Sequence, residues 1–124
     1  MESRQLTALI VDDDVLIQMI HQKMLNSVGV KNQVVENGKE AIDIHRSGQS
    51  FDLILMDKDM PVMDGIEATK ILRSMGIRSM IAAVSSRSVE EHMEEFMEAG
   101  VDIYLEKPLS ITKLNSIIHK INKH

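Results

Sequence analysis

The sequence predicts an α/β fold, a three-layer sandwich in which a parallel sheet of five strands lies between five helices. Two observations support this prediction. Short apolar runs alternate along the chain with longer segments in which apolar residues recur every three or four positions, as in proteins built from βαβ units. The central run at 53–56, Leu-Ile-Leu-Met, has no polar alternation, which is typical of a strand covered on both faces.

The expected elements follow one another in regular order. Strands are expected at 6–11, 32–36, 53–56, 80–84 and 103–105. Helices are expected between and after them, at 16–28, 39–47, 66–75, 89–99 and 110–121. Asn37 is expected as a turn or N-cap residue and Ser110 as an N-cap, because their side chains can accept a hydrogen bond from a first helical turn.

Two of these helices have apolar faces that bear on function. The first is expected to pack five residues onto the sheet: Leu16, Ile17, Ile20, Met24 and Val28. Val15 and Met19 fall outside that face, so they are expected to expose apolar surface beside the acidic residues that precede the helix. The fourth helix is expected to turn four residues inward: Val89, Met93, Phe96 and Met97.

Composition limits the class of protein. The 124 residues suit one domain, 1–124, with no second domain expected to carry an output. The absence of cysteine excludes disulfides and thiolate metal sites, and the net charge of −5 argues against a nucleic-acid-binding surface. No apolar run approaches the length of a membrane span, and the N-terminus has no signal-peptide core. A soluble protein without membrane contact is therefore expected, in the cytoplasm and with the nucleus as a second compartment.

Polar residues follow four of the expected strands at the point where each strand ends. Asp12 and Asp13 follow the first, Asp57 the third, Ser85 the fourth and Lys107 the fifth. Each has an ordinary explanation alone, such as a helix cap, a turn or a solvated charge. In a parallel sheet, however, the carboxyl ends of the strands lie on one edge, where open α/β sheets bind ligands. The sequence therefore predicts a site at that edge.

The residue types at this edge indicate phosphoryl transfer. Neighbouring carboxylates repel by about 4 kcal/mol per pair at about 4 Å and an effective dielectric constant of about 20, so one takes a proton or a cation binds. Oxygen ligands without histidine or cysteine favour a hard cation, most often Mg²⁺ where phosphate is present. Lys107 adds a second positive charge and Ser85 a hydroxyl group. Together these groups suit the transfer of a phosphoryl group onto Asp57.

Six phrases are spread in order along nearly the whole chain: L-I-V-D-D-D, V-E-N-G-K-E-A, D-L-I-L-M-D-K-D-M-P-V-M-D-G, A-A-V-S-S, F-M-E-A-G and Y-L-E-K-P-L. Together they resemble a response-regulator receiver domain, a CheY-like fold of the flavodoxin type. The resemblance implies a sheet with strand order 2-1-3-4-5. It also implies that Asp57 is the phosphoacceptor and that Mg²⁺ is held by Asp12, Asp13, Asp57 and the backbone carbonyl of Asp59.

The resemblance assigns three further residues. Lys107 corresponds to the family's lysine that precedes a proline in a cis peptide bond, here Pro108. Ser85 takes the position of the hydroxyl switch residue and Tyr104 that of the aromatic switch residue. The implied catalytic set is therefore Asp57, Lys107 and Ser85.

Within the family, the phrases M-D-K-D-M-P, I-R-S-M-I-A-A-V-S-S and L-E-K-P-L are similar to plant type-C response regulators of cytokinin phosphorelays. The similarity implies a stand-alone receiver that accepts a phosphoryl group from a histidine phosphotransfer protein or a histidine kinase, then dephosphorylates itself. Such a protein is not a conventional enzyme, but it catalyses its own phosphorylation and dephosphorylation. It is expected either to present a changed surface to a partner or to act as a phosphate sink, a phosphohistidine-protein phosphatase. A monomer is expected in preference to a dimer.

The partner surface is expected on the first helix, with Val15 and Met19, and on the loops around Asp57. The fourth helix, the fifth strand and Tyr104 form a second candidate face.

Two other functions remain open. The sequence Asp57-Lys58-Asp59 after an apolar strand also resembles the D-x-D motif of haloacid-dehalogenase-type phosphatases, in which the second Asp is a general acid. Pro61, however, stands where those proteins carry Thr or Val. The second alternative is a receiver-like interaction module that is not phosphorylated. In a phosphorylated receiver, the side chain of Asp59 would either repel the phosphoryl group or orient a water molecule.

Overall fold

The computed structural model describes residues 5–85 and 89–123, with the backbone alone described at 89–92. The described strands are β1 (Thr7–Val11), β2 (Lys31–Val35), β3 (Leu53–Asp57), β4 (Met80–Ser85) and β5 (Ile103–Glu106). They form one sheet in the order β2-β1-β3-β4-β5, and all neighbouring strands are parallel. The predicted strand order and parallel pairing are therefore confirmed.

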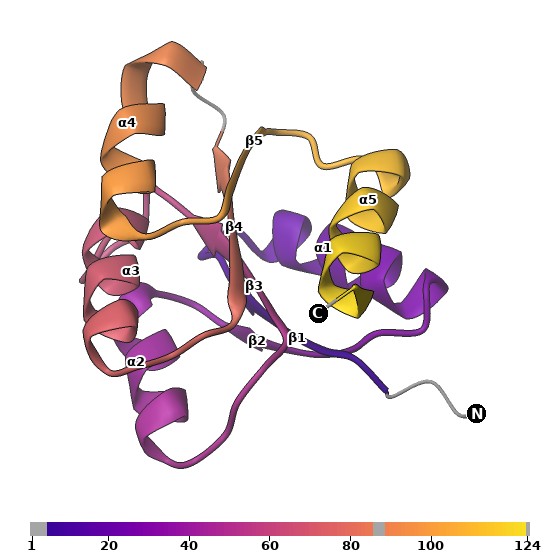
Figure 1. Cartoon of the computed structure of the whole chain (residues 1–124), viewed down its shortest axis with the longest axis horizontal. Helices are drawn as coiled ribbons and strands as arrows, with labels where there is room; N and C mark the ends of the chain where they lie inside the picture. Colours follow the sequence, from indigo (N-terminus) through magenta and orange to yellow (C-terminus); the bar gives the residue numbers. More distant parts are fainter. Residues whose placement is uncertain (1–4, 86–88, 124) are drawn as a thin grey trace.

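The helices cover both faces of this sheet (Figure 1). On one face lie α1 (Val15–Ser27) and α5 (Ile111–Asn122), and on the other lie α2 (Gly38–Arg46), α3 (Gly65–Ser74) and α4 (Val89–Ala99). This arrangement confirms the predicted three-layer sandwich. Among the described residues, no helix combines the length and apolar character needed to cross a bilayer.

The core is divided in two by the sheet, and β3 contributes to both halves. Ile54 and Met56 belong to the cluster that faces α2, α3 and α4, whereas Leu53 and Leu55 belong to the cluster that faces α1 and α5. Successive side chains of a strand point to opposite faces, so a strand with a helix layer on each side is apolar at every position. This is the physical reason for the unbroken apolar run in the sequence.

Polar side chains fix where the helices begin. Asn37 and Ser110 each accept a hydrogen bond from a backbone N–H in the first turn of α2 and α5, so both predicted N-caps are confirmed. Asp14 caps α1 and Asp64 caps α3 in the same way. Each cap satisfies donors that a helix end otherwise leaves without a partner.

The predicted inner face of α1 is wrong in part. Leu16 is 63% exposed and Ile20 is 43% exposed, whereas His21 and Leu25 are buried against the sheet. The first two turns of this helix, Val-Leu-Ile-Gln-Met-Ile, carry apolar residues on nearly every side. Periodicity therefore could not identify which side faces the sheet.

The predicted face of α4 also needs correction. Phe96 is fully buried as expected, but Met93 and Met97 are exposed. The side chain of Val89 lies outside the described residues. The described inward side chains of α4 are Phe96 and Ala99, and the ring of Phe96 lies against that of Tyr104 on β5, at 5.4 Å between centroids.

Candidate functional site

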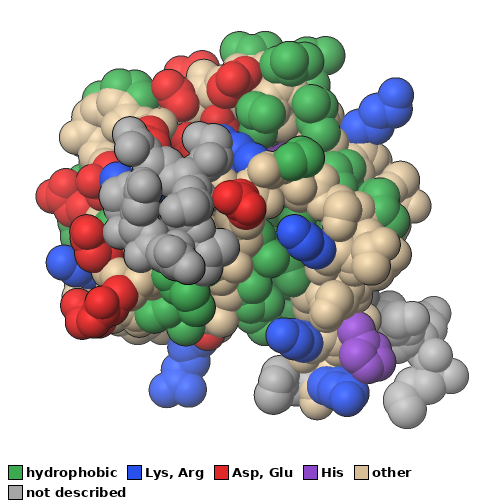
Figure 2. Space-filling view, turned by 90° about the horizontal axis from the view of Figure 1, so that it is seen from above, with side chains coloured by type: hydrophobic (Ala, Val, Ile, Leu, Met, Phe, Trp, Pro, Cys, Tyr) green, Lys and Arg blue, Asp and Glu red, His purple; other side chains and the backbone are tan. Residues whose placement is uncertain are grey.

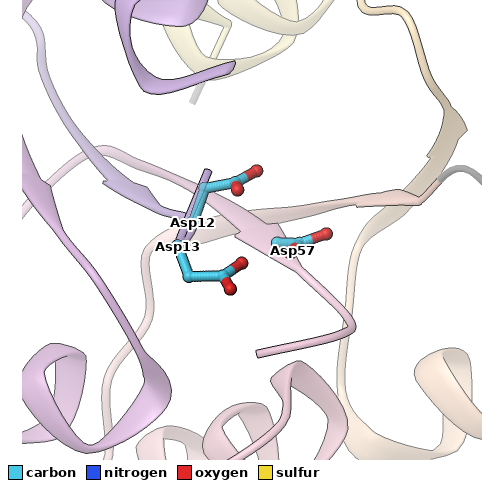
Figure 3. A group of neighbouring side chains, drawn as sticks. All are labelled: Asp12, Asp13 and Asp57. Carbon is cyan, nitrogen blue, oxygen red and sulfur yellow. The ribbon is translucent and has the colours of Figure 1, made fainter. Parts of the chain in front are cut away.

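Three carboxylates meet at the carboxyl edge of the sheet. Asp12 and Asp13 follow β1 and Asp57 ends β3, and the pairing of Val11 with Met56 in the β1–β3 ladder brings these strand ends side by side. Asp12, Asp13 and Asp57 each place a carboxylate oxygen within 4.8 Å of the others (Figure 3). The structure thus brings together the three acids that the sequence predicted.

Lys107 lies against the same carboxylates from the end of β5. Its ammonium nitrogen Nζ donates to Asp57 Oδ1 at 3.0 Å and to Asp12 Oδ2 at 3.3 Å. Its backbone N–H donates to the carbonyl of Ser85 at 2.7 Å, and the peptide bond to Pro108 is cis, as predicted. The lysine therefore bridges two of the three acids.

Burial and neighbouring charge set the electrostatics of Asp57. The residue is only 7% exposed, and burial is the main reason that its pKa is raised to about 6. The charge of Asp12 raises the pKa further, the hydrogen bond and charge of Lys107 lower it, and Asp13 raises it slightly. Burial lowers the pKa of Lys107, but the hydrogen bond and charge of Asp57, together with Asp12, outweigh burial, so the pKa is raised overall. Lys107 is therefore a permanent positive charge beside a carboxyl group that titrates near neutrality.

The other predicted residues lie around this cluster rather than in it. Ser85 is buried at the end of β4, where its carbonyl holds the backbone of Lys107. Tyr104 lies on β5, the strand next to β4, and is half-buried against Phe96. The side chain of Asp59 is 58% exposed and forms an ion pair with Lys58 at 3.4 Å.

Comparison with known proteins decides the family. Residues 8–119 match the family described as Response regulator receiver domain. This chain is a response-regulator receiver. The match covers every residue of the predicted site, so the resemblance inferred from the six phrases is confirmed.

Curated proteins similar to this receiver include response regulators of plants. Two-component response regulator 24 of Arabidopsis thaliana is 60% identical over 118 residues, which cover 95% of this chain and 85% of the relative. Two-component response regulator ARR22 of the same plant is 45% identical over 119 residues, covering 94% and 84%. These are stand-alone plant type-C response regulators, so the predicted subfamily resemblance is also confirmed.

Solved structures agree with the fold. The receiver domain of a sensor histidine kinase from Pseudomonas aeruginosa, with a magnesium ion coordinated in its active-site cleft, is 30% identical, with a TM-score of 0.86 over 98% of this chain and 100% of that one. A chain from the complex of the Saccharomyces cerevisiae histidine phosphotransfer protein Ypd1 with the receiver domain of Ssk1 is 26% identical. Its TM-score is 0.87 over 96% of this chain and 90% of that one.

The donor set of this receiver fits a hard divalent cation. Asp12, Asp13 and Asp57 offer only carboxylate oxygens, and no nitrogen or sulfur ligand belongs to the described cluster. Mg²⁺ prefers such oxygen ligands and commonly keeps water and phosphate as its other partners. A cation would also relieve the repulsion that Lys107 balances only in part.

Sequence reasoning missed Gly65, which fixes the loop after Asp57. A Cβ atom at this glycine would overlap the backbone oxygen of Asp57, so no other residue fits without moving that strand end. The N–H of Gly65 donates to the carbonyl of Lys58 at 2.9 Å and closes the loop. The Asp-Gly pair in the sequence indicates a turn, but the close approach of Gly65 to Asp57 depends on the folded loop.

A buried histidine behind the site was also missed. His21 lies on the sheet side of α1, and within the described part of the chain its Nδ1 has no hydrogen-bond partner. Its pKa is lowered, first by burial, while Asp12 raises and Lys107 lowers it. The imidazole is therefore neutral near neutral pH. No sequence signal distinguishes His21, because a lone histidine on an amphipathic helix can be either exposed or buried.

Proposed function

We propose that Asp57 accepts a phosphoryl group from a phosphohistidine, on a histidine phosphotransfer protein or a histidine kinase, in the presence of Mg²⁺. The observation that carries the proposal is the contact of Lys107 with the buried Asp57, at 3.0 Å, in a cluster of three acids of which Asp12 and Asp57 are buried and Asp13 is exposed. A buried carboxylate beside a fixed cation, at the edge of the sheet where ligands bind, suits nucleophilic attack on phosphorus.

The residues of the chain divide the chemistry between them. A carboxylate oxygen of Asp57 forms a bond to phosphorus while the bond from phosphorus to the histidine nitrogen breaks, and that nitrogen keeps the electron pair. Lys107, already hydrogen-bonded to Asp57, would pair with a phosphoryl oxygen. Asp12, Asp13, Asp57 and the carbonyl of Asp59 would hold Mg²⁺, which supplies positive charge to the phosphoryl oxygens.

In dephosphorylation, the carboxylate of Asp57 is the leaving group and no longer the nucleophile. A water oxygen attacks phosphorus, the bond to the Asp57 oxygen breaks, and the carboxylate is regenerated with release of inorganic phosphate. The hydroxyl of Ser85, at the end of β4, is proposed to donate a hydrogen bond to the phosphoryl group. Tyr104, which packs against Phe96, is proposed to respond as the aromatic switch residue.

The exposed apolar side chains of α1 are the proposed docking surface for the donor. Val15, Leu16, Met19 and Ile20 are all exposed on the two turns that follow the acidic cluster. In the view from above, hydrophobic side chains gather at the margin of the molecule beside acidic ones (Figure 2). Contiguous exposed apolar surface of this kind marks interaction sites. The similarity to a receiver solved with its phosphotransfer protein supports this assignment.

The haloacid-dehalogenase alternative has little structural support. It needs the side chain of Asp59 as a general acid directed at the substrate of Asp57. That side chain is largely exposed and paired with Lys58. Membership of the receiver family accounts for the same residues without that role.

The test is phosphate transfer from a phosphorylated histidine phosphotransfer protein, with and without Mg²⁺, for the intact chain and for Asp57→Asn. We expect loss of label from the donor only when both Mg²⁺ and Asp57 are present. Label that then stays on the receiver indicates a signalling switch, and rapid release as inorganic phosphate indicates a sink. Loss of label that does not depend on Asp57 would contradict the proposal.

A further inference from the structure

Val62 has an unusual backbone conformation in the loop that follows Asp57. Its φ angle is 73°, which makes it the one described residue other than glycine with positive φ. The N–H of Met63 donates to the carbonyl of Pro61 at 2.8 Å, so Val62 is the central residue of a γ-turn. With this sign of φ, the turn is the rare and strained form.

Nothing within the described fold accounts for valine at this position. Branching at Cβ makes valine one of the residues least suited to the left-handed region, which glycine and asparagine enter at lower cost. The side chain is 74% exposed, the most of any large hydrophobic residue described. By contrast, Met60 and Met63 on either side of it are partly buried and pack against the core. The strained residue therefore presents its apolar side chain to solvent.

The position of the loop indicates what would cover this side chain. Asp57 is nearly buried, so a phosphohistidine can reach it only if the donor protein presses against the rim of the site. The loop is part of that rim, because the hydrogen bond from Gly65 to Lys58 closes it directly beyond Asp57. The exposed face of α1 begins two residues after Asp13, in the same cluster of acids. A phosphohistidine-carrying protein that binds α1 and reaches Asp57 is therefore also brought against the loop that contains Val62.

We infer that Val62 is a contact residue for the protein that carries the phosphohistidine, and that the γ-turn holds its side chain out for that contact. This inference rests on the proposed function of Asp57. It goes beyond it by adding a specificity-determining residue that acts on binding of the protein donor and not on the chemistry. Strained residues at binding loops are commonly kept where the strain positions a functional group.

The test compares two kinds of phosphoryl donor on the same variants. Val62→Asn relaxes the backbone but removes the apolar contact, whereas Val62→Ile keeps it. With a phosphorylated histidine phosphotransfer protein, the second-order rate constant should fall about tenfold in Val62→Asn, as expected for loss of one buried aliphatic contact, and remain near the original value in Val62→Ile. With phosphoramidate, a small donor that makes no surface contact, all rates should be equal within about twofold. Asp43→Asn, which alters an exposed side chain of α2 outside both candidate partner faces, is the control and should leave both rates unchanged.

The outcomes separate this inference from the function of Asp57. Equal rates with the protein donor for Val62→Asn and the unchanged chain would overturn the inference, and so would an equal loss with both donors. If the unchanged chain gains no phosphate even from phosphoramidate, the proposed function fails, and the role of Val62 fails with it. Melting temperatures measured alongside should show no loss of stability in Val62→Asn, because asparagine suits the left-handed region.

Discussion

Asp57 has the properties of a residue shaped for reaction rather than for stability. Its carboxyl group is buried beside two other acids, so the folded state disfavours its charged form. Lys107 offsets that cost in part through a hydrogen bond at 3.0 Å. A nucleophile whose pKa lies just below neutrality is ionised at physiological pH and still poorly solvated, which favours attack on phosphorus.

The pKa of Asp57 predicts how stability depends on pH. Its value is raised from 3.8 to about 6 in the folded state, so the group stabilises the fold most below about pH 4, and this contribution is lost as the pH rises through about 6. Asp57→Asn removes the titration. In EDTA, the melting temperature of Asp57→Asn relative to the unchanged chain should therefore increase between pH 4 and pH 7. A difference that stays constant over this range would show that Asp57 is not destabilised by burial.

The pairing of residues in the site was beyond the sequence. The sequence indicated that Asp12, Asp57 and Lys107 all follow strands, and parallel pairing placed them on one edge. Asp12 and Lys107 are separated by 95 positions, so the bridge between them depends on how the strand ends are spaced in the folded sheet. The conformation of Val62 was also invisible, because a run of Met-Pro-Val-Met gives no signal for positive φ.

At the scale of elements, α1 shows where periodicity fails. Strand β3 was predictable because helices on both faces require apolar side chains at every position, and the N-caps of α2 and α5 followed from Asn37 and Ser110. In α1, the buried surface that packs on the sheet and the exposed surface that we propose for docking are both apolar. Only the structure separates Leu25, which is buried, from Leu16, which is exposed.

A matched pair of substitutions in α1 tests this division. Leu16→Ala should change the free energy of unfolding by less than about 0.5 kcal/mol, because its side chain is already in solvent. Leu25→Ala should cost about 2–5 kcal/mol, because it leaves a cavity between the helix and the sheet. Urea unfolding of both variants measures the two values. Similar losses would mean that Leu16 packs in the core, as its spacing first indicated.

A cluster of hydrogen bonds around Arg73 lies at the opposite end of the sheet from Asp57. The guanidinium of Arg73 on α3 donates to the carbonyls of Gly100, Ile77 and Ser79, and to the carboxylate of Asp102, over 2.8–2.9 Å. It thereby ties the end of α3 to the segments that lead into β4 and β5. A planar fork with several donors is suited to this role, and an ammonium group is not.

Arg73→Lys should therefore lower stability without altering the chemistry. We expect a loss of about 2 kcal/mol in the free energy of unfolding, because three carbonyls and the carboxylate of Asp102 each lose a donor, although Asp102 still accepts from the backbone N–H of Ile81. The rate of phosphorylation by phosphoramidate at 25 °C should not change. Urea unfolding and a phosphorylation time course on the same sample check both parts. A slowed reaction in the folded variant would instead reveal coupling between the two ends of the sheet.

At the scale of the whole molecule, the sheet separates stability from chemistry. The Arg73 contacts hold the amino ends of β4 and β5, whereas the carboxyl edge gathers Asp12, Asp13, Asp57 and Lys107. The strand ends and loops at that edge lie outside the apolar core, so they can carry charged groups that the core would reject. The fold class and the acidic site were predictable because they depend on the alternation of strands and helices, whereas the strand order was implied by the resemblance to receiver domains. The docking surface was predictable only in part, because exposure cannot be read from apolar residues alone.

The most direct test of the account is the mass of the intact protein after incubation with phosphoramidate and Mg²⁺. We predict the addition of a single phosphoryl group to the unchanged chain and to Asp43→Asn, which alters an exposed aspartate of α2 paired with Lys39. Asp57→Asn should gain none, and EDTA should prevent the addition in every sample. A phosphoryl group found on Asp57→Asn, or none on the unchanged chain, would contradict the assignment of Asp57 as the phosphoacceptor.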